Sequence, residues 1–399
     1  MPRPQFNRNV YEIQPSITMA VTGRAKEMKA KGIDVISMSA GEPDFDTPRH
    51  IKDAAIQAIN DGITKYTPVA GTPALRKAVA DKFKRENGIE YAPEQILCSI
   101  GGKHSCYLAV AALVNEWDEV LIPAPYWVSY PPMVTLQGGT PVIMETSTAS
   151  GLKITPEQLK AAITPRTKML IFNSPSNPSG AVYTRDEMTA LAEVLLGTNV
   201  YVVSDEIYEH LIYDGDHVSL LNVEPKLKDQ VIITNGVAKA YSMTGWRVGY
   251  AAGPLEIIKQ MSKIQSQQTS NVTSFAQVGT IAALEGPQDH IAEWRTAFDE
   301  RRQYIVKRLN AIPGVVCPTP NGAFYVFPDI GSYFGKSYNG TVIDDSVALT
   351  SMLLEEFHVA TVPGSGFGSP DHIRLSYACS MEQIEGAMTR IEEGLAALV

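Results

Sequence analysis

Cysteine is scarce in this chain of 399 residues, and its four cysteines form no CxxC pair. Such spacing offers neither a disulfide framework nor a cysteine zinc site, and it suits a reducing compartment. The seven histidines show no paired ligand spacing either, so the sequence predicts no metal site.

A long apolar stretch and an excess of positive charge are also missing. The longest apolar run, Tyr107 to Val114, is far too short to span a bilayer, and residues 1–20 mix charge and proline in a way unlike a signal peptide. The net charge of −9 repels nucleic acids and anionic membrane surfaces. We therefore expect a cytoplasmic protein that binds neither nucleic acid nor membrane.

What the chain does contain is a series of short apolar runs separated by helix-length segments. Runs with so little polar alternation are typical of parallel strands that are buried on both faces, which predicts an α/β fold. Thr47 and Pro48 are expected to begin one of the helices, with Thr47 as its cap. The predicted strands are Gln95–Ile100, Glu119–Ile122, Lys168–Phe172, Val200–Ser204 and Val231–Thr234.

The domain organisation is inferred from this pattern, because no repeat or low-complexity linker marks a boundary. Residues 49–290 hold the predicted strands and are expected to form a large domain. Residues 291–399, with long helices predicted over Ile291–Leu309 and Met381–Leu398, are expected to form a smaller α+β domain. The N-terminal arm, residues 1–48, is expected to join this smaller domain, which is then discontinuous.

The most informative segment runs from Asn235 to Tyr250 and reads NGVAKAYSMTGWRVGY. Its lysine, Lys239, follows a predicted strand end, where α/β folds place ligand chemistry. A partly desolvated lysine there can lose its proton and form a Schiff base with an aldehyde cofactor. The alternative for a lone lysine is a solvated surface charge.

Four further segments read AGEPDF (40–45), PYWVSY (125–130), NSPSNPSG (173–180) and SDEIY (204–208). Together with the Lys239 segment they resemble, in the same order, the class I aminotransferases, which are pyridoxal-phosphate enzymes of fold type I. Within that family they resemble the bacterial-type aspartate aminotransferases. The resemblance covers almost the whole chain. It implies a mostly parallel central sheet flanked by helices, a smaller discontinuous α+β domain, and pyridoxal 5'-phosphate as cofactor.

The same resemblance assigns residues around the cofactor ring. Lys239 would carry the cofactor and act as general base, and Asp205 would keep the pyridine nitrogen protonated, which makes the ring an electron sink. Tyr208 and Asn177 would hydrogen-bond the phenolic oxygen, and Trp127 would stack on the ring. Taken singly, these residues could equally be a helix cap, a turn or core packing.

Other residues match the family's phosphate site. Gly101 and Gly102 lie where a strand meets a helix N-terminus, whose free N–H groups favour phosphate, and Lys103 follows them directly. Arg247 would hold the same phosphate as a charged clamp. Tyr66 matches the tyrosine that reaches the phosphate from the neighbouring subunit in this family, which implies a homodimer with shared sites.

Substrate recognition requires cations for carboxylates. Arg374 matches the family's arginine for the α-carboxylate, and Gly41 would add a backbone contact. Lys103 matches a lysine that pairs with the distal carboxylate in bacterial-type aspartate enzymes, although solvent exposure is the alternative for it. Trp127 and Asn177 complete the expected substrate site, whose partners are small amino acids and 2-oxo acids.

Two positions depart from the family pattern. Gly236 stands three residues before Lys239, where other aminotransferases carry a phosphate-binding serine, although bacterial-type aspartate enzymes tolerate a small residue there. Gln14 precedes Pro15, where relatives that also transaminate prephenate carry lysine. Activity on prephenate is therefore not expected.

The expected reaction moves the amino group of L-aspartate to 2-oxoglutarate, giving oxaloacetate and L-glutamate, in a ping-pong cycle. An aminotransferase of aromatic or aliphatic amino acids, or a β-lyase or decarboxylase with the same cofactor, is the nearest alternative. A nicotinamide oxidoreductase would have to use Gly364–Gly368, which lacks an evident βαβ unit. A pure binding module is disfavoured, because the residues for imine chemistry are present.

Overall fold

A computed structural model describes residues 7–399; the first six residues of the N-terminal arm lie outside the described residues. Within that range the largest sheet has seven strands in the order β2-β8-β7-β6-β5-β3-β4. Neighbours pair in parallel except at β8, which is antiparallel to both β2 and β7. The strands are β2 (Ile96–Ser99), β3 (Glu119–Pro123), β4 (Thr140–Met144), β5 (Thr167–Asn173), β6 (Tyr201–Asp205), β7 (Val231–Gly236) and β8 (Gly249–Ala252). The predicted α/β fold with a mostly parallel sheet is confirmed.

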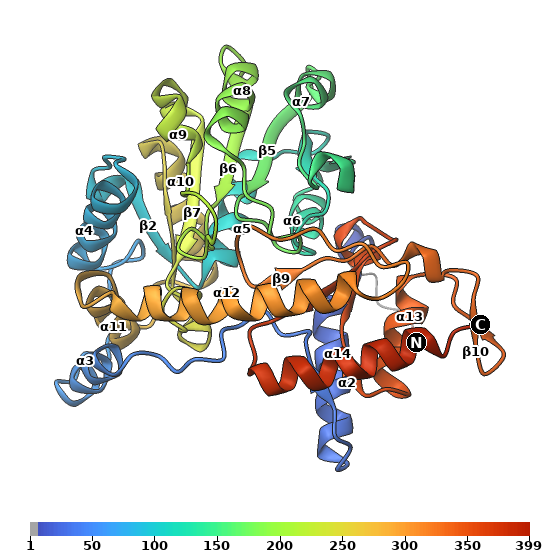
Figure 1. Ribbon diagram of the computed structural model, residues 1–399. Coiled ribbons are helices and arrows are strands. Elements are labelled where there is room, and N and C mark those ends of the chain that lie inside the picture. Colours follow the sequence, from blue (N-terminus) through green and yellow to red (C-terminus); the bar gives the residue numbers. More distant parts are fainter. Residues whose placement is uncertain (1–6) are drawn as a thin grey trace, which may run out of the picture.

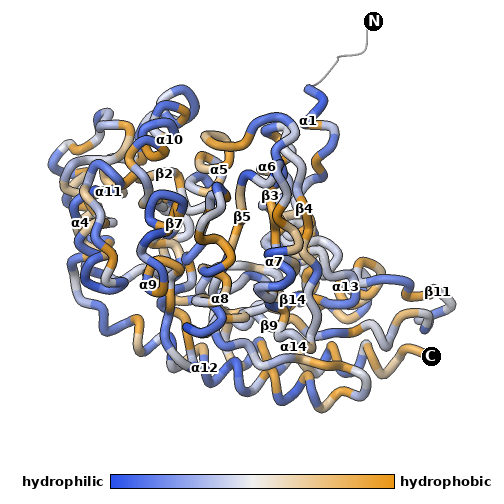
Figure 2. The backbone as a smooth tube through the Cα atoms, turned by 90° about the horizontal axis from the view of Figure 1, so that it is seen from above, coloured by the Kyte–Doolittle hydropathy of each residue, from blue (hydrophilic) through white to orange (hydrophobic). Residues whose placement is uncertain are grey.

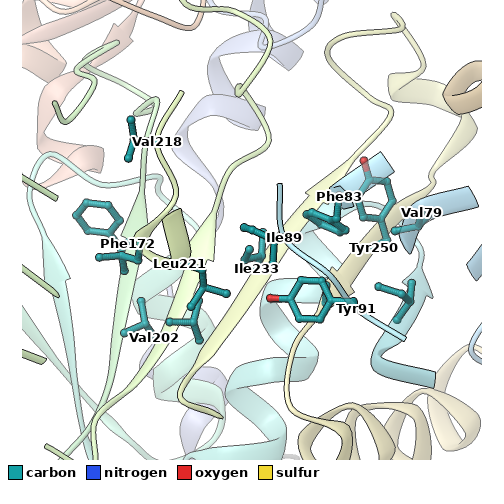
Figure 3. Packing of buried hydrophobic residues seen from close by; sticks show 14 of the residues in the cluster. Val79, Phe83, Ile89, Tyr91, Phe172, Val202, Val218, Leu221, Ile233 and Tyr250 are labelled. Carbon is teal, nitrogen blue, oxygen red and sulfur yellow. The ribbon is translucent and has the colours of Figure 1, made fainter. Parts of the chain in front are cut away.

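Both faces of this sheet are buried, as the uninterrupted apolar runs predict. In β5, Leu170 and Phe172 belong to one hydrophobic cluster, whereas Met169 and Ile171 belong to another. Successive side chains of a strand point to opposite faces, so a run that is apolar throughout fills two cores. Figure 3 shows the first of these cores, where Phe172 lies on the sheet with neighbours from several elements.

Helices cover the two faces and connect the strands. Helix α8 (Arg185–Leu195) illustrates the local signals: Thr184 accepts a hydrogen bond from the N–H of Glu187, whose carboxylate accepts one from the N–H of Thr184. The others around the sheet are α3 (Arg49–Asn60), α4 (Pro73–Lys82), α5 (Gly102–Leu113), α6 (Tyr130–Leu136), α7 (Pro156–Ala162), α9 (Leu220–Val223), α10 (Leu255–Gln268) and α11 (Ser274–Glu285).

One helix start differs from the prediction. Helix α3 begins at Arg49 with Pro48 as its N-cap residue, and no side chain caps it. Thr47 instead donates a hydrogen bond to the carbonyl of Ser242 (2.6 Å) and accepts one from the indole of Trp246 (3.2 Å). The predicted cap is wrong, because a tertiary contact takes the hydroxyl that would otherwise cap the helix.

The C-terminal part forms a separate core with small sheets. Strands β13 (Val362–Pro363), β14 (Ile373–Ser376) and β9 (Tyr325–Val326) form one of them. The N-terminal strand β1 (Ile36–Ser37) pairs in parallel with β12 (Val359–Ala360), so the N-terminal arm packs on the C-terminal part. The remaining elements are α1 (Arg8–Tyr11), α2 (Ile17–Ala30), β10 (Ser337–Tyr338), β11 (Thr341–Val342), α12 (Asp289–Asn310), α13 (Ser346–Glu355) and α14 (Met381–Ala396).

Helix α12 extends from the side of the molecule that holds α11 to the side that holds α14 (Figure 1). Along α12 the tube in Figure 2 alternates between hydrophilic and hydrophobic residues, as expected of a helix with one face on a core. We propose the predicted division into residues 49–290 and 291–399, with residues 1–48 joining the latter. Among the described residues, no helix combines the length and apolar character needed to cross a membrane.

Candidate active site

Lys239 lies just after the end of β7, with its amine in the interior. The Nζ atom donates a hydrogen bond to the carbonyl of Gly41 and lies 5.7 Å and 5.6 Å from the ring centroids of Tyr208 and Phe324. Burial lowers the pKa of Lys239 to about 8, and the Glu42 carboxylate only partly offsets it. At pH 7 about a tenth of such an amine is neutral, far more than for an exposed lysine. The residue is therefore suited to nucleophilic attack on an aldehyde.

Asp205 ends β6 and is buried. Its Oδ2 atom accepts hydrogen bonds from the hydroxyl of Tyr130 (2.7 Å) and the thiol of Cys106 (3.7 Å), and Oδ1 accepts one from the N–H of Ile207 (3.3 Å). Burial raises the pKa of Asp205, and the hydrogen bond from Tyr130 opposes that rise. The carboxylate has no cationic partner among the described residues, so a cationic ring nitrogen would compensate its charge.

Sequence reasoning missed Tyr130 and Cys106. Tyr130 closes the quoted segment PYWVSY, yet nothing in a single sequence says that its hydroxyl reaches a carboxylate 75 residues away. Cys106 sits on α5, where a small apolar-like residue is ordinary packing. Only the fold, which brings residues of α5 and the start of α6 to the end of β6, reveals these two contacts.

Arg374, on β14, is the most unusual charge in this region. Its side chain is buried, with 2% of the residue exposed; Nη1 donates to Oδ1 of Asn177 (3.0 Å) and Nη2 to the carbonyl of Ser39 (2.7 Å). The Nε atom has no hydrogen-bond partner, and no carboxylate among residues 7–399 forms an ion pair with this guanidinium. Burial lowers the pKa of Arg374. An uncompensated buried guanidinium is a ready site for a carboxylate.

Tyr208 and Asn177 lie beside this arginine and Lys239. The hydroxyl of Tyr208 forms a hydrogen bond with that of Tyr325 (2.8 Å), and the Tyr325 ring lies 4.5 Å from the Arg374 guanidinium carbon. Because Oδ1 of Asn177 accepts from Arg374, its amide nitrogen is oriented elsewhere and can donate to a ligand. The structure thus brings these predicted residues together around one space.

The glycine pair lies where three backbone segments meet. Gly101 has φ +80°, and a Cβ atom there would lie 2.5 Å from Nη2 of Arg247; Gly102 begins α5. A Cβ atom on Gly249 would lie 2.3 Å from the nitrogen of Gly102, and one on Gly236 would lie 2.9 Å from Cα of Gly249. Glycine is required for this close approach. A helix N-terminus and a guanidinium consequently face the same space, as an anion site needs.

Lys103 and Trp127 are also neighbours. The Nζ atom of Lys103 lies 4.9 Å from the centre of the Trp127 ring, and burial, followed by repulsion from Arg247, lowers the pKa of Lys103. A cavity of about 860 Å³ begins at Lys103 and Arg247, and its other walls, which include Gln14, are mainly apolar. Tyr66 stands apart from all these residues, with 91% of its surface exposed.

These groups fit a phosphorylated pyridine aldehyde. A lysine that can be neutral, a buried carboxylate, an aromatic ring and an anion site are the partners that its aldehyde, ring nitrogen, ring face and phosphate require. The buried Arg374 with its unpartnered Nε lies beside them and can hold a carboxylate of a second ligand.

Residues 33–391 match the family described as aminotransferase class I and II. The chain is 52% identical to an aspartate aminotransferase of Geobacillus stearothermophilus over 98% of both chains, and 53% identical to an aspartate/prephenate aminotransferase of Cereibacter sphaeroides over 97% of both. A crystal structure of the aspartate aminotransferase of Rhizobium meliloti superposes with a TM-score of 0.95 at 44% identity, covering 99% of this chain and 100% of that one. The chain belongs to the class I and II aminotransferases.

Proposed function

We propose that this protein is a pyridoxal-phosphate-dependent aspartate aminotransferase. It would move the amino group of L-aspartate to 2-oxoglutarate, giving oxaloacetate and L-glutamate, in a ping-pong cycle. The observation that carries this proposal is a lysine with its pKa lowered to about 8 near a buried arginine for which residues 7–399 supply no counterion. Relatives about half identical over nearly the whole chain carry the name of this activity, which supports aspartate as donor.

Residues of this chain would hold the cofactor from every side. Lys239 would bond to its aldehyde carbon, and Asp205 would accept a hydrogen bond from the protonated ring nitrogen. Tyr208 and the amide nitrogen of Asn177 would donate to its phenolic oxygen, and Trp127 would lie on the ring. When bound, pyridoxal phosphate supplies an electron-withdrawing ring that stabilises negative charge at the carbon bearing the amino group.

The phosphate would sit where the backbone segments converge. Its oxygens would accept hydrogen bonds from the N–H groups of Gly102 and Lys103 and from the guanidinium of Arg247. Tyr66 is proposed to reach the phosphate of the neighbouring subunit in a homodimer, a role that its 91% exposure leaves open to it. A cytoplasmic location and the absence of nucleic-acid and membrane partners are part of the same proposal.

The substrate would be oriented by two cations. Arg374 would bind the α-carboxylate through Nε and one terminal nitrogen, with the backbone of Gly41 beside it, and Lys103 would pair with the distal carboxylate. Lys239 would act as the general base, taking up the proton of the substrate α-carbon on Nζ and later giving it up from the same atom. Its lowered pKa keeps the amine able to accept that proton near neutral pH.

Donors with apolar side chains are a second candidate, favoured by the largely apolar cavity of about 860 Å³ next to Lys103. Some relatives are named aspartate/prephenate aminotransferases. Gln14 lines the same cavity in this chain and carries no charge, so prephenate is not proposed as a substrate.

Replacing Lys239 tests the proposed function. Lys239→Ala should abolish both the yellow chromophore of the cofactor-loaded protein and turnover, because the variant lacks the amine that would bond to the cofactor. The measurement is an absorption spectrum with and without aspartate, followed by a donor screen of the wild-type protein. Repeated turnover of aspartate by the variant, or a wild-type protein that binds no pyridoxal phosphate, would contradict the proposal.

A further inference from the structure

A second group of polar and charged residues, most of them buried or half-buried, lies behind the turn that carries Asp205 and Tyr208. We call it the rear cluster; it borders a polar cavity of about 520 Å³. None of its members has a place in the proposed catalysis. Its residues are Lys82, Glu86, Asn87, Glu206, Glu209, His210, His217 and Asn235.

Glu209 is the centre of the rear cluster. Its side chain is 4% exposed; Oε1 accepts hydrogen bonds from Nζ of Lys82 and Nδ2 of Asn235 (2.8 Å), and Oε2 accepts one from Nδ2 of Asn87 (2.7 Å). Burial raises the pKa of Glu209, but attraction to Lys82 and to the two nearby imidazoles outweighs it and holds that pKa far below its usual value. The ionised form of this carboxylate is therefore favoured, and both of its oxygens are hydrogen-bonded.

The carboxylates and imidazoles of the rear cluster also have the composition of a metal site. Lys82 argues against one, because its ammonium, only 1% exposed, already bonds Glu209 and lies 3.5 Å from Glu86. A bound cation would have to displace that ammonium. The cluster is better explained by what it joins.

Glu209 joins the two segments from which the proposed catalytic groups project. It directly follows Tyr208 and lies four residues after Asp205, whereas Asn235 lies four residues before Lys239. Asn235 also accepts a hydrogen bond from the N–H of Gly236 on its Oδ1 atom (2.7 Å), which fixes the end of β7. The bond between Glu209 and Asn235 thus spans the two strand ends directly behind Tyr208 and Lys239.

We propose that Glu209, held by Lys82 and Asn235, is a positioning residue that sets the placement of Tyr208 relative to Lys239. This inference rests on the proposed function, in which Tyr208 donates to the cofactor that Lys239 carries. The backbone ladder holds β6 to β7 as far as Glu206, so loss of the link would let the turn beyond it, which carries Tyr208, shift against the end of β7. The hydroxyl of Tyr208 would then act less well on the chromophore, although Glu209 never touches it.

The test uses a charge-balanced variant, Lys82→Met/Glu209→Leu, because apolar replacement of a whole buried ion pair preserves folding better than removal of one partner. The matched control is Glu206→Gln on the same turn. The Glu206 carboxylate is equally buried but is bonded to Ser204, Ser219 and His217 rather than to β7. Each cofactor-loaded protein is titrated by absorption, and its unfolding is measured alongside.

We expect the titration midpoint of the chromophore to rise by about one pH unit in the double variant, since a tyrosine donor stabilises the deprotonated chromophore. In a Tyr208→Phe background the same pair of changes should move it far less, as coupling through Tyr208 requires. The Glu206→Gln control removes a charge that acts on Asp205, so any shift it causes should be the same with and without Tyr208. Asn235→Ala, which cuts the link without touching the ion pair, should reproduce the rise if the double variant does not fold.

Two results would overturn the inference. An unchanged midpoint in the folded double variant or in Asn235→Ala, with only unfolding affected, would mean that the rear cluster stabilises the fold and nothing more. A shift of equal size with and without Tyr208 would mean that the rear cluster acts on the chromophore by a route other than Tyr208. A wild-type protein with no chromophore at all would instead refute the proposed function, so the two failures are distinguishable.

Discussion

The two sides of the turn after β6 differ in whether their buried charges are paired. In the rear cluster, Lys82 and Glu209 satisfy each other and their neighbours. On the catalytic side, Arg374 has no counterion within the described part of the chain and an unpartnered Nε atom, and the pKa of Lys239 is lowered to about 8 by burial. Paired charges hold a structure together, whereas unpaired ones cost stability and are retained where a ligand completes them.

Replacing one cation on each side gives the largest expected contrast. Lys82→Met leaves the buried Glu209 carboxylate without its ion-pair partner and should lower the free energy of unfolding by about 3–5 kcal/mol. Arg374→Met removes a charge that has no counterion, so its loss should cost only about 1–2 kcal/mol, from the two acceptors left without donors. In catalysis the order reverses: kcat/KM for aspartate should fall by roughly two to three orders of magnitude in Arg374→Met.

Urea unfolding of the cofactor-free proteins and steady-state kinetics would measure both quantities. Equal losses of stability in the two variants would break the comparison. So would a wild-type kcat/KM in Arg374→Met, because the arginine would then be unpaired without being the carboxylate site.

Much of this architecture is predictable from the sequence, because the short apolar runs at β2, β3, β5, β6 and β7 are typical of buried strands. Two strands of the same sheet were not predicted. Strand β8 reads GYAA and β4 reads TPVIM, so one is built of small residues and the other contains proline and begins exposed. Their pairing with neighbours, which sequence cannot display, makes them strands.

The residues of the site also fall into those that the sequence identifies and those that only the fold reveals. Lys239, Asp205 and Arg374 stand in segments whose family resemblance identifies them. The hydrogen bond from Tyr130 to Asp205 and the rear cluster behind Tyr208 depend on contacts over 75 and 127 residues of chain. Such contacts are fixed by strand order, and a single sequence carries no signal for them.

The two sides should also differ in how their stability depends on pH. The pKa of Glu209 is lowered on folding, so the stability it contributes is complete above its ordinary pKa of 4.5 and is lost as the pH falls further. Lys239 has a pKa of about 8 in the folded protein against 10.5 when exposed. Its charged form therefore lowers the free energy of unfolding of the cofactor-free protein below pH 8, and this loss disappears above pH 10.5.

Comparing variants with the wild type measures the pH range of each effect. The gap in unfolding free energy between the wild type and Lys82→Met/Glu209→Leu should shrink as the pH falls below 4.5. Lys239→Met should be more stable than the wild type below pH 8, and this advantage should fade between pH 8 and 10.5. Denaturant melts at a series of pH values would measure both, and a constant Lys239→Met difference across that range would show that the lysine is not desolvated.

The smallest expected effect on catalysis concerns Asp205, which is hydrogen-bonded like Glu209 but, among residues 7–399, forms no ion pair. Tyr130→Phe removes one neutral donor to its carboxylate and should cost about 1–3 kcal/mol of stability, since the buried acceptor loses a partner. Burial then raises the pKa of Asp205 with less opposition. A carboxyl group that holds its own proton no longer compensates a protonated ring nitrogen, so kcat should fall several-fold, with the loss concentrated at acid pH.

Cys106→Ala, which removes the longer thiol contact, is the matched control and should change the pH profile less. If kcat of Tyr130→Phe fell by the same factor at every pH, the hydrogen bond from Tyr130 would not control the protonation of Asp205.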